Sequence, residues 1–355
     1  MLGTILTFQI QMQTRHLSTL TFAAGCLAAT FLLPLEGAAH PELPAPTWDH
    51  VAPLMAERCV SCHRAGGNAA LSLDTYDAAR LVAGAIKRSV LDRRMPPWRA
   101  APGFGEFAND PSLSAAEIEL LAAWADGGAR KGDGGGPPIV PPVDDPAPAD
   151  VVLRPNDAYS IAGPRHTFEL PLGNDRERWL RGWRFVPGNE TAVTQAEVSI
   201  ANAGPLGTWV PGDGATELPA DAAYRLPRRA TLVVDVRYRK MSAAASDASG
   251  VAIVFASKPR REVRHLTLPC GTTHAAGDLR ILSVRPSIES FGDAIEIMAR
   301  RPDGAIAPLG WFRNYPPQFR ATYRYRHPVS LPEASTIDVR SADGTCSADL
   351  EYLID

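Results

Sequence analysis

A stretch rich in glycine and proline divides this chain of 355 residues into two parts of different character. Residues 132–150 read GDGGGPPIVPPVDDPAPAD, and more than half of them are Gly or Pro. Such a segment cannot bury enough apolar surface to fold, so it predicts a semi-extended linker. Residues 40–131 before it are rich in Ala and show helical periodicity, whereas residues 151–355 carry short apolar or alternating runs separated by turn signals. The sequence therefore predicts a small all-α domain followed by an all-β region.

The second part has the pattern of many short antiparallel strands. Residues 230–238 and 251–256 read ATLVVDVRY and VAIVFA, and both are rich in β-branched side chains. Residues 319–327 alternate aromatic or small side chains with Arg and Thr. This part is too long for one small sandwich of roughly 100 residues. We therefore expect two antiparallel, jelly-roll-like sandwiches, over residues 151–258 and 259–355.

Two helices of the first part are predicted from their ends and faces. The run from Trp48 to Arg58 places apolar side chains on one face. Further on, Ser114 is expected to cap a helix, with Glu117 as its capping-box partner and Gly127 as its stop.

The charge balance excludes one broad class of partner. The chain has 36 Lys and Arg against 39 Asp and Glu, a formal net charge of −3. A nucleic-acid-binding protein carries a marked basic excess, so we expect no nucleic-acid partner. The basic stretches 258–264 and 313–327 are better interpreted as a linker between sandwiches and the solvated face of a strand. Either could also dock an acidic redox partner.

Residues 1–39 predict an export signal. A short basic start precedes an almost wholly apolar run over residues 17–35, and the small residues 37–39 suit a signal peptidase. The alternative is a membrane anchor that stays in place, but Pro34 interrupts the run and no basic stop-transfer cluster follows it. We expect a cleaved signal, a periplasmic protein and no stable membrane span after cleavage.

The most specific motif is the string CVSCH at residues 59–63. Two thiols at this spacing can each add to a vinyl group of one haem, while the imidazole that follows takes an axial position on the iron. We predict one covalently bound haem c, attached through Cys59 and Cys62, with His63 as an axial ligand. The competing interpretations are a thioredoxin-like pair, which needs a preceding strand, and half of a zinc site, which needs another Cys/His pair nearby.

Met95 is the predicted second axial ligand. It stands in the segment RMPPW, where two prolines cannot continue a helix and therefore hold the methionine at an extended corner. The alternative is a core methionine, and Met55 on the helical run before the motif is the other methionine of this part. Ligation by His and Met favours electron transfer over oxygen activation, because it closes the coordination sphere of the iron.

A family resemblance covers nearly all of the chain after the predicted signal. Residues 51–131, with the segments CVSCH, RRMPPW, FGEFAND and LSAAEIELLAAWADGGA, resemble the class I cytochrome c module that is fused to copper type II ascorbate-dependent monooxygenase domains in bacteria. The remainder resembles that second domain, which is related to peptidylglycine hydroxylating monooxygenase, in segments such as DVVLRPNDAY, RWLRGWRFVPGN and GTWVPGD. The resemblance implies two β-sandwiches with one copper on each.

The chain departs from the family at the copper ligands. Five positions at which the family presents imidazoles read here Thr194, Gln195, Arg237, Ser287 and Glu289. Copper prefers imidazole and thioether donors, and a guanidinium does not deprotonate in proteins. The histidines of this part are scattered singly: His166, His265, His274 and His327. We therefore expect a copper-free relative of the monooxygenase.

Cys270 and Cys346 are the two remaining cysteines after the predicted signal. In an oxidising compartment a disulfide between them would close a long loop, and the alternative is that each is a small buried residue. The bond requires the two Cα atoms to lie within about 7 Å of each other.

These features predict an exported c-type cytochrome whose single haem carries electrons to or from a periplasmic redox partner protein. The β region would then serve as a scaffold for docking or ligand binding. Two other functions stay open. One is a copper-dependent monooxygenase fed by the haem, the only case in which the chain would be an enzyme, and the other is a sensor whose haem binds a small ligand.

Overall fold

A computed structural model describes the chain over residues 45–134, 148–257, 259, 261–290, 294–315, 321–342 and 344–354. The predicted export signal, residues 1–39, and most of the predicted linker lie outside the described residues. Within the described ranges, no helix is long and apolar enough to cross a membrane.

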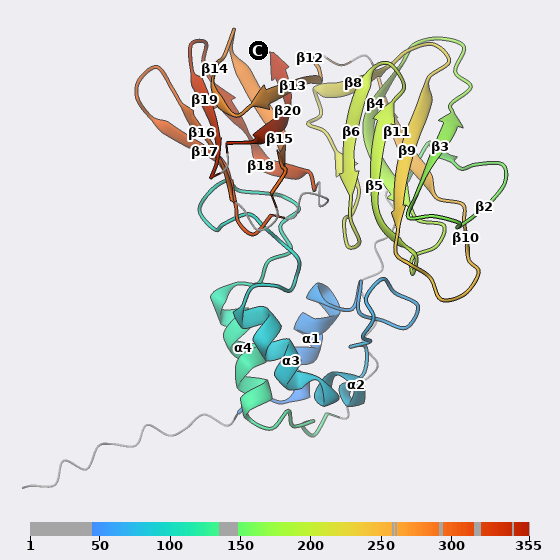
Figure 1. Ribbon diagram of the computed structural model, residues 1–355, viewed down its shortest axis with the longest axis vertical. Helices are drawn as coiled ribbons and strands as arrows, with labels where there is room; N and C mark the ends of the chain where they lie inside the picture. The colour runs from blue at the N-terminus through green and yellow to red at the C-terminus, as the bar shows by residue number, and fades with distance from the viewer. Residues whose placement is uncertain are drawn as a thin grey trace, which may run out of the picture. The chain divides into compact units, whose positions relative to one another are not determined.

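The helices of the first part are α1 (Trp48–Arg58), α2 (Tyr76–Leu81), α3 (Ala83–Leu91) and α4 (Ala115–Asp126) (Figure 1). They share one apolar core, in which the rings of Trp48 on α1 and Trp124 on α4 lie 5.8 Å apart. The predicted ends of α4 are confirmed. The Ser114 N–H donates to the Glu117 carboxylate at 2.7 Å, the Glu117 N–H donates to the Ser114 hydroxyl at 3.2 Å, and Gly127 ends the helix.

The first β region runs from β1 to β12 (Figure 1). Its strands are β1 (Val151–Leu153), β2 (Tyr159–Ser160), β3 (Arg165–Pro171), β4 (Arg178–Val186), β5 (Val193–Ile200), β6 (Gly204–Trp209), β7 (Thr216–Glu217), β8 (Ala222–Leu226), β9 (Thr231–Tyr238), β10 (Ser246–Asp247), β11 (Gly250–Ala256) and β12 (Arg261–Glu262). One sheet has the order β1-β11-β4-β8-β12 with β7 beside β4, a second has the order β3-β9-β5-β6, and β10 pairs with β2. The apolar faces of the two larger sheets supply one core.

The second β region runs from β13 to β20 (Figure 1). Its strands are β13 (Arg264–Pro269), β14 (Gly271–His274), β15 (Leu279–Ile288), β16 (Ile295–Arg300), β17 (Ile306–Phe312), β18 (Tyr323–Leu331), β19 (Thr336–Ser341) and β20 (Cys346–Ile354). They form two sheets, with the orders β13-β20-β15-β18 and β14-β19-β16-β17, which enclose another core.

Strand periodicity in the sequence accounts for these elements. The predicted strands at 230–238 and 251–256 are confirmed as β9 and β11, and every second residue of β9 is buried. In β18 the alternation is also confirmed for Tyr323 and Tyr325, which are buried while Arg326 is exposed. Except for the short parallel pair β8 and β12, the described strand pairs are antiparallel. The described chain is therefore mostly β structure in several antiparallel sheets.

The segment that connects α3 and α4 packs partly against the second β region. Residues 98–109, which we call the arm, leave the helical core and pair with β17 and β18 of the second β region. Ala100 forms a β-bridge with Phe312, and Phe107 forms one with Tyr325. Phe107 is buried in the second β core, and its ring packs 5.4 Å from the ring of Tyr323. No sequence pattern indicated this pairing.

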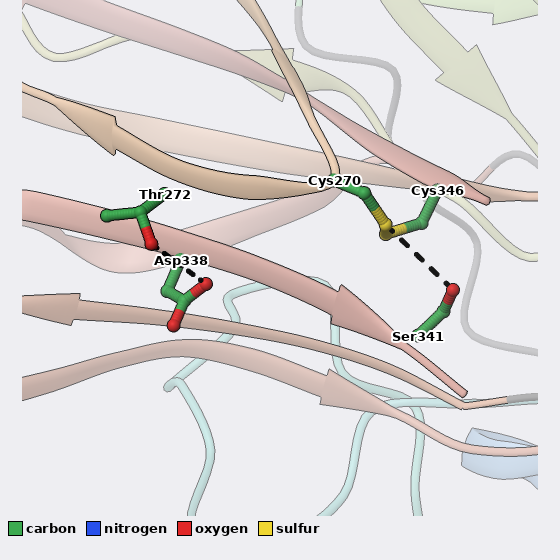
Figure 2. The surroundings of a disulfide bond; sticks show 5 residues. All are labelled: Cys270, Thr272, Asp338, Ser341 and Cys346. Atoms are coloured by element: carbon green, nitrogen blue, oxygen red, sulfur yellow. Dashed lines mark hydrogen bonds between the residues drawn. A yellow bond between two sulfur atoms is a disulfide. The ribbon is translucent and has the colours of Figure 1, made fainter. Parts of the chain in front are cut away.

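Cys270 and Cys346 are joined by a disulfide, with their Cα atoms 5.0 Å apart (Figure 2). Cys270 lies where the chain passes from β13 in one sheet to β14 in the other, and its N–H donates to the carbonyl of Cys346 at 2.9 Å. The bond therefore ties the first turn of the second β region to its last strand, across 76 residues of sequence.

Replacing both residues (Cys270→Ser with Cys346→Ser) should lower the free energy of unfolding by about 2–5 kcal/mol, because the unfolded chain regains the freedom of a long loop. Denaturant unfolding of the oxidised protein measures this loss. A reductant should destabilise the wild-type protein and leave the double variant unchanged. Equal midpoints for the two oxidised proteins would contradict the expectation.

Candidate functional site

The CVSCH motif begins where α1 ends. Cys59 caps the helix by donating its N–H to the carbonyl of Met55 at 2.9 Å, and the N–H groups of Cys62 and His63 both donate to the carbonyl of Cys59. Val60, between the two cysteines, is fully buried in the helical core. This anchor holds the turn, so that the two thiols stay partly exposed and are not joined to each other.

The imidazole of His63 is oriented by one backbone acceptor. Its Nδ1 lies 2.9 Å from the carbonyl oxygen of Leu71. Since a carbonyl can only accept, Nδ1 carries the proton, and the lone pair of Nε2 is available to coordinate a metal ion. Metal-binding histidines are usually held in one tautomer by such a hydrogen bond from the ring nitrogen that does not bind the metal. The sequence motif identified His63 but not this carbonyl, which lies in an irregular loop.

Both thiols of the motif are shifted toward the protonated form. Burial, together with the neighbouring Cys62, raises the pKa of the Cys59 thiol to about 11. Burial also raises the pKa of the Cys62 thiol. A thioredoxin-like pair works through a thiolate of lowered pKa, so the direction of both shifts disfavours that interpretation.

The two methionines of the helical part have opposite environments. Met55 on α1 is fully buried in the core, whereas Met95, just after α3, is 44% exposed. Met95 is placed by its own N–H, which donates to the carbonyl of Ser89 at 3.2 Å. It lies on the wall of a cavity of about 270 Å³, together with Val90, Leu113 and Ile118. Its thioether, unlike that of Met55, is therefore accessible to a bound group.

The structure brings Cys59, Cys62 and His63 into one turn and places Met95 on a different loop. Among the described residues, the lining of the cavity beside Met95 does not include the three motif residues. The donors present are two unpaired thiols, one imidazole Nε2 and one accessible thioether. This set matches the chemistry of a c-type haem, which needs two thioether bonds and two axial ligands.

The loop that follows the motif is fastened to the first β region. The Asn68 side-chain amide donates to the carbonyls of Val193 and, at 3.3 Å, of Glu190. Arg239 donates to the Asn68 side-chain oxygen at 2.8 Å and to its backbone carbonyl. Arg64 forms an ion pair with Glu190. These contacts were not indicated by the sequence, because their partners lie more than 100 residues away.

A turn of the first β region also approaches the motif. Gly212, between β6 and β7, has φ +96°, and a Cβ added to it would lie 3.7 Å from the Sγ of Cys62. The left-handed backbone explains why glycine stands there. The turn formed by Pro211, Gly212 and Asp213 therefore lies against one of the two cysteines.

The five positions predicted to lack copper ligands are engaged otherwise or exposed. The Thr194 hydroxyl donates to the carbonyl of Arg237 at 3.1 Å, and Gln195 is buried and faces Arg237 across the strand pair β5 and β9. Ser287 faces Ser347 in the register of β15 and β20, and Glu289 is exposed just beyond β15.

The four histidines of the β regions lie on separate strands, β3, β13, β14 and β18. His166 stacks on Tyr159 with ring centroids 3.7 Å apart, and burial lowers the pKa of His265. His274 and His327 are exposed. In the part of the chain that the structure describes, no three His, Cys, Asp or Glu side chains gather as a metal site.

Comparison with known proteins adds no family to these observations. No protein-family model and no curated protein matches the chain. Among solved structures, the major capsid protein P2 from bacteriophage PM2 is 11% identical and covers 57% of this chain and 97% of its own, with a TM-score of 0.25. Oxalate decarboxylase from Bacillus subtilis is 10% identical and covers 61% of this chain and 79% of its own, with a TM-score of 0.17. Scores this low carry no argument about fold or function.

Asn68→Ala should lower the free energy of unfolding by about 1–3 kcal/mol, because the half-buried guanidinium of Arg239 and the carbonyl of Val193 both lose a partner. Chemical denaturation followed by tryptophan fluorescence measures this change. Asn156→Ala is the matched control, since Asn156 is exposed in the loop between β1 and β2. A loss no larger than that of the control would show that the Asn68 contacts contribute nothing.

Proposed function

We propose that this protein is an exported c-type cytochrome that transfers electrons through a single haem. The observation that carries the proposal is the CVSCH turn itself. Two unpaired thiols stand three residues apart, and the histidine that follows them has its Nδ1 held by the Leu71 carbonyl. Two free thiols and an imidazole whose Nε2 has its lone pair available support covalent haem attachment at this motif.

Four residues of the chain would attach the haem and bind its iron. Cys59 and Cys62 would hold the haem through thioether bonds, and His63 and Met95 would be its axial ligands. When bound, the haem supplies a one-electron couple at the iron. The hydrogen bond from His63 Nδ1 to Leu71 fixes the ring and raises the basicity of Nε2. The thioether of Met95 as the other ligand would raise the reduction potential and would favour electron transfer over oxygen activation.

The β regions would serve as a scaffold rather than as an oxygenase. We interpret them as two jelly-roll-like sandwiches of the monooxygenase type whose copper positions carry Thr194, Gln195, Arg237, Ser287 and Glu289. Arg237, 3.9 Å from Glu197, would place a fixed positive charge where the family binds a cation. Export to the periplasm is supported by the apolar run near the N-terminus, and a periplasmic redox protein would be the partner.

The first test of this proposal is covalent attachment. Protein matured in a host that assembles c-type cytochromes should keep its haem after acidified acetone, and metal analysis should give one iron and no stoichiometric copper per chain. A variant with Cys59→Ala and Cys62→Ala should lose the haem under the same treatment. Haem that acid acetone extracts from the mature wild-type protein would overturn the assignment, and two tightly held copper ions would restore the oxygenase alternative.

The second test concerns Met95. Met95→Ala should abolish the weak long-wavelength thioether-to-iron absorption of the ferric protein and lower its reduction potential, because the ligand that favours ferrous iron is removed. Met55→Leu is the matched control, since this change keeps the volume of a core side chain and should leave the absorption in place. An unchanged spectrum in Met95→Ala would transfer the role to another residue. Carbon monoxide binding by the reduced wild-type protein would favour the sensor alternative.

A further inference from the structure

The cavity beside Met95 is strongly basic. Its lining includes four arginines, Arg93, Arg94, Arg99 and Arg313, against a single acidic residue, Asp92. Asp92 is already engaged, because its carboxylate accepts from Nε of Arg94 at 3.3 Å. The remaining arginines therefore present uncompensated positive charge to a cavity of about 270 Å³.

Two of these arginines are held opposite each other by the backbone. Arg99 is on the arm and Arg313 follows β17, and the Arg313 N–H donates to the carbonyl of Arg99 at 3.0 Å. The neighbouring bridge between Ala100 and Phe312 sets the register, so Arg99 and Arg313 are direct cross-strand partners. Like charges directly opposite each other on paired strands are destabilising, and an anion between them would relieve the repulsion.

Neither guanidinium has an anionic partner in the described part of the chain. No described carboxylate lies within 4.0 Å of Arg99 or Arg313 as an ion pair. Arg313 lies over the ring of Trp311 at 5.0 Å, a contact that orients a cation without neutralising it. The pair is thus preorganised for an anion from outside the chain, and an arginine fork matches the planar geometry of a carboxylate.

The other residues that line the cavity indicate what kind of anion would bind there. Val90, Met95, Leu113 and Ile118 give the cavity an apolar wall, and Trp98 adds an aromatic one. A ligand that fits both surfaces is apolar over most of its area and carries carboxylates at one edge. Haem has this form, because its propionates lie at the edge opposite the vinyl groups that Cys59 and Cys62 would hold. The lining of the cavity contains Met95 but not Cys59, Cys62 or His63, as this division requires.

We propose that Arg99 and Arg313 bind the propionate carboxylates of the haem, so that the second β region completes the haem site. This inference rests on the proposed function. The arm would then position a haem-binding residue, because it places Arg99 beside β17, and Met95 lies three residues before the arm begins. The β region is then part of the redox centre as well as a scaffold beside it.

The test uses mature holoprotein with Arg99→Gln, Arg313→Gln and the two changes combined, and Arg228→Gln as the control. Arg228 is exposed in the turn between β8 and β9. At mildly alkaline pH, each change at the pair should reduce the equilibrium constant for haem reduction about tenfold, because a positive charge near the iron stabilises the ferrous state. The propionate bending bands in resonance Raman spectra should shift in the same variants. Covalent attachment and the Met95 absorption should not change.

Potentials and Raman bands equal to those of Arg228→Gln would overturn this inference, while retained covalent haem would leave the proposed function standing. A free carboxylate is the other source of the same chemistry, and succinate is the probe for it. If the pair takes a free carboxylate, succinate will raise the melting temperature of wild-type holoprotein but not of the double variant, with Raman bands identical in all proteins. That result would also overturn the assignment to haem. Loss of haem by acid acetone would instead remove the proposed function on which the inference rests.

Discussion

The backbone pairing between the arm and β17 is the contact on which the arrangement of the candidate site depends. Hydrogen bonds from Ala101 to Trp311 and from Arg313 to Arg99 add the arm to a sheet edge, and the burial of Phe107 fixes it there. Because the arm starts three residues after Met95, this pairing limits where the methionine can lie. An exposed thioether on a free loop would lose rotamer and backbone entropy on becoming a ligand. A loop already fastened at one end loses less, which would favour the ligand role proposed for Met95.

The CVSCH turn, unlike the segment after Met95, is held by local interactions. Val60 is buried between the cysteines, the Cys59 carbonyl accepts two N–H groups, and the Leu71 carbonyl selects the tautomer of His63. The thiols remain protonated because burial disfavours their charged form. A redox-active thiol pair requires a thiol of lowered pKa. The surroundings of Cys59 and Cys62 raise the pKa of both thiols, which disfavours a thioredoxin-like pair. Asn68 and Gly212 then connect this turn to the first β region.

The β regions do not depend for their stability on the five positions at which the predicted resemblance would place copper ligands. Their stability comes from the apolar faces of paired sheets, and none of Thr194, Gln195, Arg237, Ser287 and Glu289 is a member of the two buried cores. Thr194, Gln195 and Arg237 lie on the paired strands β5 and β9, where the Thr194 hydroxyl donates to the carbonyl of Arg237.

The sequence by itself determined what short-range physics controls. The capping box of α4, the strands β9 and β11 and the alternation in β18 follow from side chains that are near neighbours along the chain. The spacing of CVSCH also predicts haem attachment at Cys59, Cys62 and His63, and the two prolines after Met95 predict it as a ligand; both stay predictions. Only the tertiary structure decided the pairing of Arg99 with Arg313, the contacts of Asn68 and the acceptor at Leu71. These contacts depend on backbone groups that every residue possesses, or on partners that only the folded chain brings together, so no local pattern of side chains encodes them.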